Sequence, residues 1–153
     1  MLNHVIPEFE LPSTGGKTFK LSDFKNDTGT LVIYFYPKDN TPGCTNQGQD
    51  FRDHYPEFKS AGCEIVGISR DSLKSHENFK AKFSFPFELL ADTEELACSI
   101  FGVMKMKKMY GKEVRGVERS TFVIRKGVLV QEWRGVKVDG HVQSVLDFVK
   151  TLN

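Results

Sequence analysis

The residues best suited to chemistry lie in a short polar stretch that ends in a cysteine, Pro37-Lys38-Asp39-Asn40-Thr41-Pro42-Gly43-Cys44. Threonine commonly caps a helix N-terminus and proline suits the first helical position, so Thr41 and Pro42 place Cys44 in the first turn of a predicted helix. Backbone N–H groups without intrahelical partners point outward there, and the helix dipole favours an anion. The sequence therefore predicts a thiol held where the thiolate, the nucleophilic form, is stabilised.

Two elements must position this thiol. Residues 31–36 form an unbroken apolar segment of β-branched and aromatic types, which predicts a strand buried on both faces. The helix after the polar stretch is expected to run toward Ala61, with Gly62 just beyond its end. Pro56 lies inside that span and predicts a kink or a break, because it removes one backbone donor.

The rest of the chain alternates predicted strands and helices. In order, we expect a hairpin over 9–21, a strand over 63–69, a helix from Asp71 or Ser72 to about Phe83, a strand over 85–90, a helix from Asp92 to near Phe101, a basic methionine-rich loop over 104–115, a hairpin of 120–124 with 128–133, and a helix over 141–152. This pattern predicts an α/β, thioredoxin-like fold, with a central mixed sheet flanked by helices and an N-terminal β-hairpin extension. No repeat or linker interrupts it, so we expect one domain over residues 1–153.

Composition narrows the class of protein. The formal net charge of +1 gives no reason to expect nucleic acid or an acidic membrane surface as a partner. No apolar run approaches the roughly 20 residues that span a bilayer, and the N-terminus lacks the features of a signal peptide. Three cysteines in 153 residues do not make a disulfide scaffold, so we expect a protein of the reducing cytoplasm.

Metal and cofactor sites are not indicated by the residue spacing. The four histidines, His4, His54, His76 and His141, are scattered and have no paired cysteines at ligand spacing, so we interpret them as surface or capping residues. Position 47 is glutamine, which leaves Cys44 without the second thiol of a Cys-x-x-Cys motif. The absence of a vicinal dithiol argues against a general disulfide oxidoreductase. We expect neither a metal nor an organic cofactor.

Pro37, Thr41 and Cys44 form a Pro-x-x-x-Thr-x-x-Cys pattern, which resembles the active-site signature of the peroxiredoxins. The longer stretch 41–45, followed by residues 51–53, resembles the peroxiredoxin Q, or bacterioferritin comigratory protein, subfamily. Further segments agree with it at residues 67–72, 109–112 and 118–122. The resemblance covers nearly the whole chain in order.

The resemblance implies roles for four residues. Cys44 is the peroxidatic thiolate, the Thr41 hydroxyl hydrogen-bonds the thiolate and the peroxide, Pro37 shields the site, and Arg119 favours the thiolate and polarises the peroxide. It implies a thiol-dependent peroxidase that reduces hydrogen peroxide and organic hydroperoxides through a Cys44 sulfenic acid, in antioxidant defence and cell redox homeostasis. A monomer is the expected state.

The chain departs from the subfamily in its resolving cysteine. The two family positions hold Gln49 and Lys80, so we expect a one-cysteine mechanism with an external thiol, from thioredoxin, glutaredoxin or a small molecule. Cys98 is the alternative resolver, within or between chains, although the interpretation that we favour for it is core packing. Cys63 is the first residue of a predicted strand and is interpreted as structural.

Other functions stay open at this point. A redox relay would pass the sulfenate's oxidation to a client protein as a mixed disulfide. A non-catalytic thioredoxin-like binding module would be indifferent to Cys44. The basic segment 104–115 is interpreted as a solvated loop, with electrostatic steering of an acidic reductase as the alternative.

Overall fold

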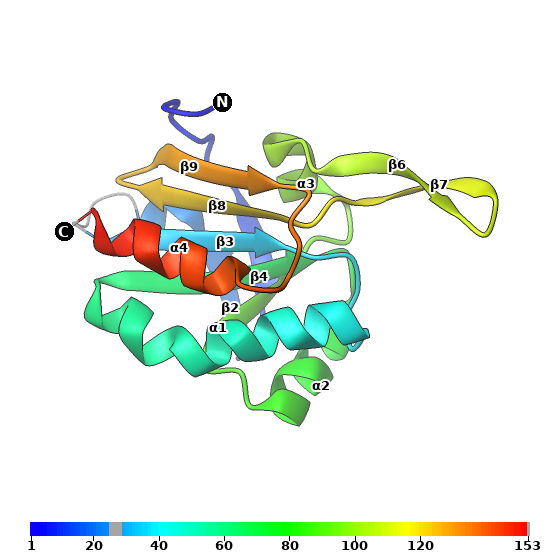
Figure 1. Ribbon diagram of the computed structural model, residues 1–153, viewed down its shortest axis with the longest axis horizontal. Helices are drawn as coiled ribbons and strands as arrows, with labels where there is room; N and C mark the ends of the chain where they lie inside the picture. Colours follow the sequence, from blue (N-terminus) through cyan, green and yellow to red (C-terminus); the bar gives the residue numbers. More distant parts are fainter. Residues whose placement is uncertain (25–28, 153) are drawn as a thin grey trace.

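The computed structural model describes residues 1–24 and 29–152, and it has a mixed sheet with helices on both faces (Figure 1). The strands are β1 (Glu10–Ser13), β2 (Lys17–Lys20), β3 (Thr30–Phe35), β4 (Cys63–Ser69), β5 (Glu88–Ala91), β6 (Met104–Met109), β7 (Lys112–Val117), β8 (Ser120–Arg125) and β9 (Val128–Arg134). The helices are α1 (Pro42–Ser60), α2 (Leu73–Phe83), α3 (Leu96–Phe101) and α4 (His141–Lys150), and a 3-10 turn covers Leu21–Phe24. The predicted α/β thioredoxin-like fold is confirmed, including the N-terminal hairpin β1–β2.

The main sheet has seven strands in the order β2-β1-β5-β4-β3-β8-β9. β3 runs parallel to β4 and antiparallel to β8, and all six of its residues are buried. Alternate side chains of this segment enter two different cores: Ile33 and Phe35 on one face, Tyr34 and Tyr36 on the other. The prediction that residues 31–36 form a strand covered on both faces is therefore confirmed.

Helices α1 and α4 lie side by side on the face that Tyr34 enters (Figure 1). Phe51 of α1 and Val145 of α4 belong to this core. The opposite core contains α3 and residues that precede β1. Among the described residues, no helix has both the length and the apolar character needed to cross a membrane.

Helix α1 continues through Pro56, so of the predicted kink or break the break is wrong, and the kink stays a prediction. Phe51 and Phe58, on either side of the proline, are both fully buried against the sheet. This packing on both sides holds the two halves in one helix although Pro56 cannot donate a backbone hydrogen bond. The predicted end was correct, since Ala61 is the C-cap and Gly62 follows with φ at +73°.

The predicted basic loop is in fact a second, two-stranded sheet formed by β6 and β7. Tyr110 and Gly111, both with positive φ, form its two-residue turn. Methionine and lysine partly alternate in β6, as the two faces of a strand require. The many lysines favoured the prediction of a loop instead. The hairpin projects away from the body of the molecule (Figure 1).

Two helix starts test the capping predictions. Ser72 caps α2 and accepts a hydrogen bond from the Ser75 backbone N–H at 3.2 Å. α3 begins at Leu96, later than expected, because Asp92 stays outside the helix. The Asp92 carboxylate accepts the backbone N–H groups of Ala97 and Cys98 at 3.2 and 2.8 Å, so it caps the helix from four residues before its start.

Gly48 in α1 gives a test of how tightly this helix packs beside Cys44. Alanine is favoured over glycine in a helix by about 1 kcal/mol, but a Cβ at position 48 would lie 2.5 Å from Cζ of Phe85. That ring is stacked on Phe87 and meets Phe79 edge-on, so it has no room to move. We expect Gly48→Ala to destabilise the fold by about 1–3 kcal/mol, measured by urea unfolding. Ser60→Ala, on the exposed last turn of α1, is the control and should be close to neutral; a Gly48→Ala protein as stable as wild type would contradict this packing.

Candidate active site

Cys44 lies in the first turn of α1, as the sequence predicts, with Thr41 at the N-cap and Pro42 at the first helical position. The first intrahelical bond runs from the Thr45 N–H to the Thr41 carbonyl at 2.8 Å. The residue is 2% exposed, and it packs in the core that contains Tyr34. The thiol is therefore covered by protein although it stands at a helix N-terminus.

Arg119 lies beside Cys44 although 75 residues separate them in the sequence. Its Nη2 donates to the Cys44 Sγ at 3.4 Å, within the range for a hydrogen bond to sulfur. The register of the sheet explains the contact, because Ser120 at the start of β8 pairs with Phe35 at the end of β3. Residue 119 must then lie at the edge where the chain leaves β3 toward Cys44.

Gln47 completes this arrangement, and the sequence reasoning missed its role. The Arg119 Nη1 donates to the Gln47 Oε1 at 2.6 Å, so one guanidinium joins the thiol and the amide. Gln47 is fully buried, and its Nε2 has no partner among the described residues. The available signal was its spacing, since a residue three positions after Cys44 lies on the same face of the helix.

Gly43 allows the guanidinium to come close to the helix. A Cβ at this position would lie 3.2 Å from the Arg119 Nη2. A larger residue before Cys44 would therefore compete with the arginine for space.

Thr41 and Pro37 lie in the loop before α1, and both are half-buried. The Thr41 hydroxyl donates to the Lys38 carbonyl at 2.8 Å and makes no capping bond to the helix. Within the described residues, no hydrogen bond joins Thr41 to Cys44. Since its proton is directed at Lys38, the hydroxyl oxygen remains free to act as an acceptor.

Cys63 and Cys98 are far from the proposed nucleophile in the fold. Cys63 pairs with Thr30 at the start of β3, so about 16 Å of strand separates it from the end that leads to Cys44. Cys98 belongs to the core on the opposite face of the sheet from Cys44. A disulfide needs Cα atoms within roughly 7 Å, so neither can reach Cys44 in this conformation.

The same two thiols are held in their unreactive form. Burial raises the pKa of Cys63 to about 12, and the nearby Glu64 carboxylate adds to the effect. Burial and the hydrogen bond with Asp92 raise the pKa of Cys98 well above its ordinary value. A thiol that stays protonated is a poor nucleophile.

The β6–β7 hairpin contributes a cation near the site. Burial, together with the positive charge of Arg119, lowers the pKa of Lys107, while Cys44 acts in the opposite direction. The Lys107 Nζ donates to the Val117 carbonyl of the neighbouring strand. Lys107 is therefore a half-buried strand residue that feels the charge of Arg119, which corrects the interpretation of the basic segment as a solvated loop.

The histidines correct another prediction, since His76 and His141 are buried. His141 contacts the Thr121 hydroxyl at 2.8 Å, and burial lowers its pKa to about 4. His76, Asp39 and Asp71 offer ligand atoms within 4.8 Å of one another, a set that could hold a metal ion. All three already make hydrogen bonds to protein groups, so the set is satisfied by the protein itself.

The chain is similar to a described protein family and to characterised bacterial proteins. The model of the AhpC/TSA family matches residues 2–132. "Peroxiredoxin Bcp" of Xanthomonas campestris pv. campestris is 57% identical over 121 residues, which cover 78% of this chain and 76% of that protein. "Peroxiredoxin Bcp" of Bacillus subtilis is 47% identical over 148 residues, covering 96% and 93%. The chain belongs to the AhpC/TSA family.

Similar solved structures indicate the peroxiredoxin subfamily of this chain. The Xanthomonas campestris peroxiredoxin Q has a TM-score of 0.88 and 51% identity over 94% of this chain and 90% of that one. Peroxidoxin BcpB from Mycobacterium tuberculosis has a TM-score of 0.87 and 30% identity, covering 99% and 97%. This peroxiredoxin is therefore of the Q/Bcp subfamily and is a thiol-dependent peroxidase, not a non-catalytic binding module.

The contact between Arg119 and Cys44 predicts a large effect of removing the guanidinium. Losing one preorganised donor to a developing negative charge typically slows a reaction by about 100-fold or more. We expect Arg119→Met to lower the second-order rate constant for oxidation by hydrogen peroxide by that amount, measured by competition with a haem peroxidase. Arg115→Met, which removes an arginine that pairs with Glu95, is the control and should retain the wild-type rate. Equal rates in the two variants would show that Arg119 does not assist the reaction.

Proposed function

We propose that Cys44 is the peroxidatic residue of this enzyme. Its thiolate sulfur attacks one oxygen of the peroxide, the O–O bond breaks, and the second oxygen leaves and takes up a proton to become water or an alcohol. Sulfur is oxidised to sulfenic acid and the peroxide is reduced. The observation that carries the proposal is the Arg119 guanidinium at 3.4 Å from a sulfur in the first turn of a helix.

The neighbouring groups fit this step. Arg119 stabilises the thiolate and the negative charge that develops on the leaving oxygen. The Thr41 oxygen, whose own proton is directed at Lys38, can accept a hydrogen bond from the peroxide. Pro37 is half-buried in the same loop, where its ring can shield the site. The reaction that these groups support needs neither a metal nor an organic cofactor.

The sulfenic acid is reduced by an external thiol in a one-cysteine mechanism. The external thiol attacks the Cys44 sulfur and forms a mixed disulfide with release of water. A second thiol then reduces this mixed disulfide and regenerates the Cys44 thiol. The family positions for a resolver hold Gln49 and Lys80, and Lys80 forms an ion pair with Glu88. The distant, protonated thiols of Cys63 and Cys98 support this mechanism over the one with Cys98 as resolver.

The proposed substrates and reductant follow from the thiol chemistry and from the basic β6–β7 hairpin. Hydrogen peroxide and organic hydroperoxides are the proposed substrates, and one neighbouring structure concerns the alkyl peroxide reduction activity of the Xanthomonas campestris protein. Thioredoxin, glutaredoxin or a small thiol supplies the electrons. Lys105, Lys108 and Lys112 have no ion-pair partner among the described residues, and this supports steering of an acidic reductase. We further propose a monomer in the cytoplasm.

Oxidation with one equivalent of hydrogen peroxide tests the mechanism. We expect the intact mass to show one dimedone adduct at Cys44 in wild type and in Cys98→Ser, because no protein thiol can reach the sulfenic acid. Cys44→Ser should give no adduct and no turnover. Loss of two hydrogens, or a covalent dimer, that disappears in Cys98→Ser would instead make Cys98 the resolver. Mixed disulfides with client proteins in place of turnover would favour the redox relay.

A further inference from the structure

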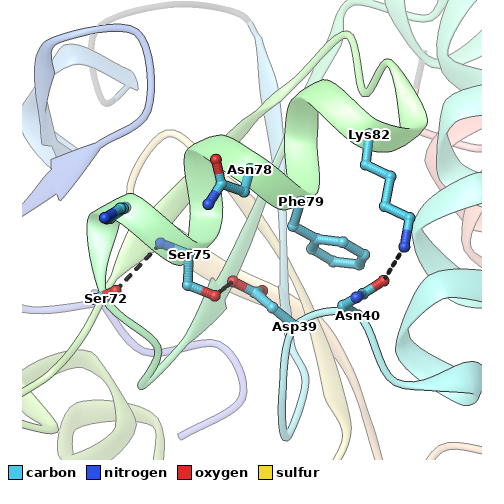
Figure 2. A pocket seen from close by; sticks show the side chains of 8 residues that line it. Asp39, Asn40, Ser72, Ser75, Asn78, Phe79 and Lys82 are labelled. Carbon is cyan, nitrogen blue, oxygen red and sulfur yellow. Dashed lines mark hydrogen bonds between the residues drawn. The ribbon is translucent and has the colours of Figure 1, made fainter.

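A buried carboxylate beside the active site takes no part in the proposed chemistry. Asp39 lies two residues before Thr41, and its side chain is 3% exposed. It accepts hydrogen bonds from the Tyr36 hydroxyl at 2.6 Å, the Ser75 hydroxyl at 2.8 Å and the His76 Nδ1 at 2.7 Å. Ser75 and His76 belong to α2, so the carboxylate joins α2 to the loop that precedes Cys44 (Figure 2).

The backbone of the same residue is fixed as well. The Asp39 N–H donates to the Asp71 Oδ2 at 2.8 Å, and the Ser69 hydroxyl donates to the same oxygen at 2.6 Å. Ser69 ends β4 and Asp71 lies between β4 and α2. Asp39 is thus held through its side chain and its backbone by the segment that leads into α2.

Other contacts between the loop segment and α2 include the packing of the Tyr36 ring against His76 and Phe79. An open pocket of about 400 Å³ lies between them, lined by Asn40 and Asp39 from the loop and by Asn78, Phe79 and Lys82 from the helix. Across the pocket, Lys82 donates to the Asn40 side-chain oxygen at 3.2 Å (Figure 2). The buried bonds of Asp39 are therefore the main polar connection between the two elements.

The side chains of Asp39 and His76 satisfy each other's buried polar atoms. The His76 Nε2 lies 2.9 Å from the Leu90 carbonyl, which can only accept, so this nitrogen carries a hydrogen. The His76 Nδ1 lies 2.7 Å from the Asp39 Oδ2, which also accepts from the Ser75 hydroxyl. Removing either Asp39 or His76 therefore leaves buried polar atoms of the other without a partner.

We propose that Asp39 and His76 are positioning residues of the peroxidase. They hold residues 37–41 against α2, so that Thr41 and Cys44 keep the arrangement in which peroxide is attacked, and neither touches the sulfur. The same connection keeps Cys44 covered. The inference rests on the peroxidatic role proposed for Cys44.

If Asp39 and His76 act in this way, loosening their bonds should change the two steps of the cycle, attack on peroxide and reduction of the sulfenic acid, in opposite directions. Attack on peroxide depends on the placement of Thr41 and Cys44, and a misplacement of about 1 Å can cost up to roughly 100-fold. Reduction of the sulfenic acid by a thiol depends on access to a sulfur that is 2% exposed. Loosening the connection should therefore slow the first step and quicken the second.

The experiment measures both steps in full-length Asp39→Ala. Competition with a haem peroxidase gives the rate constant with hydrogen peroxide, and loss of dimedone labelling gives the rate at which dithiothreitol removes the preformed sulfenic acid. We expect the first to fall by about tenfold or more and the second to rise severalfold. His76→Ala should change both in the same directions, and the double variant should cost no more than Asp39→Ala alone, since the two act as one unit.

Three further variants separate positioning from stability. Asp39→Asn keeps an acceptor oxygen and should recover part of the peroxide rate. Ser75→Ala removes one bond and should give a smaller change in the same directions, even if Asp39→Ala folds poorly. Ser72→Ala removes the cap of α2 but leaves the three bonds of Asp39 intact, so it should weaken the fold without separating the two half-reactions.

Two results would overturn the inference. One is a folded Asp39→Ala protein in which both rates stay within about twofold of wild type. The other is a decrease of both rates in proportion to the unfolded fraction, as a structural role alone would give. A wild-type protein that forms no dimedone-reactive sulfenic acid would contradict the proposed function itself, and the wild-type measurement shows this without any variant.

Discussion

The antiparallel pairing of β3 with β8 is the constraint on which the active site depends. β3 leads directly into the loop and helix that carry Cys44, and the register that places Ser120 opposite Phe35 puts Arg119 at the same edge of the sheet. A slip of one residue would turn every side chain of β8 to the other face. The hydrophobic cores on both faces therefore fix the position of the Arg119 guanidinium beside a thiol that is 75 residues away in the sequence.

The site is built from polar groups placed inside an apolar core, and not all of their polar atoms have a partner within the part of the chain that the structure describes. Arg119 shares its guanidinium between the thiol and Gln47, while the Nε2 of Gln47 and the hydroxyl of Tyr34 have no partner among the described residues. Burial raises the pKa of Tyr34 well above its ordinary value, and the nearby Cys44 adds to this, so the phenol stays protonated in the core.

One fold makes three cysteines chemically different. Cys44 stands at a helix N-terminus beside a guanidinium, whereas Cys63 and Cys98 are buried next to carboxylates that favour the protonated thiol. Cys98 lies in the core on the opposite face of the sheet from Cys44. Of the three thiols, only Cys44 has a guanidinium as a hydrogen-bond donor among the described residues, and a nearby cation favours the thiolate.

The sequence by itself determined the local features of this peroxiredoxin. The buried strand, the helix start at Thr41 and Pro42 and the place of Cys44 all depend on neighbouring residues, and these were predicted correctly. The contacts of Gln47, Asp39 and His76 and the pairing of β6 with β7 could not be predicted, because hydrogen bonds and strand pairing between distant segments decide them. Arg119 could be assigned only by resemblance, since its contact with Cys44 follows from the register of the sheet. Tertiary structure decided which polar residues are buried, because burial depends on how the helices cover the sheet and leaves no regular spacing in the sequence.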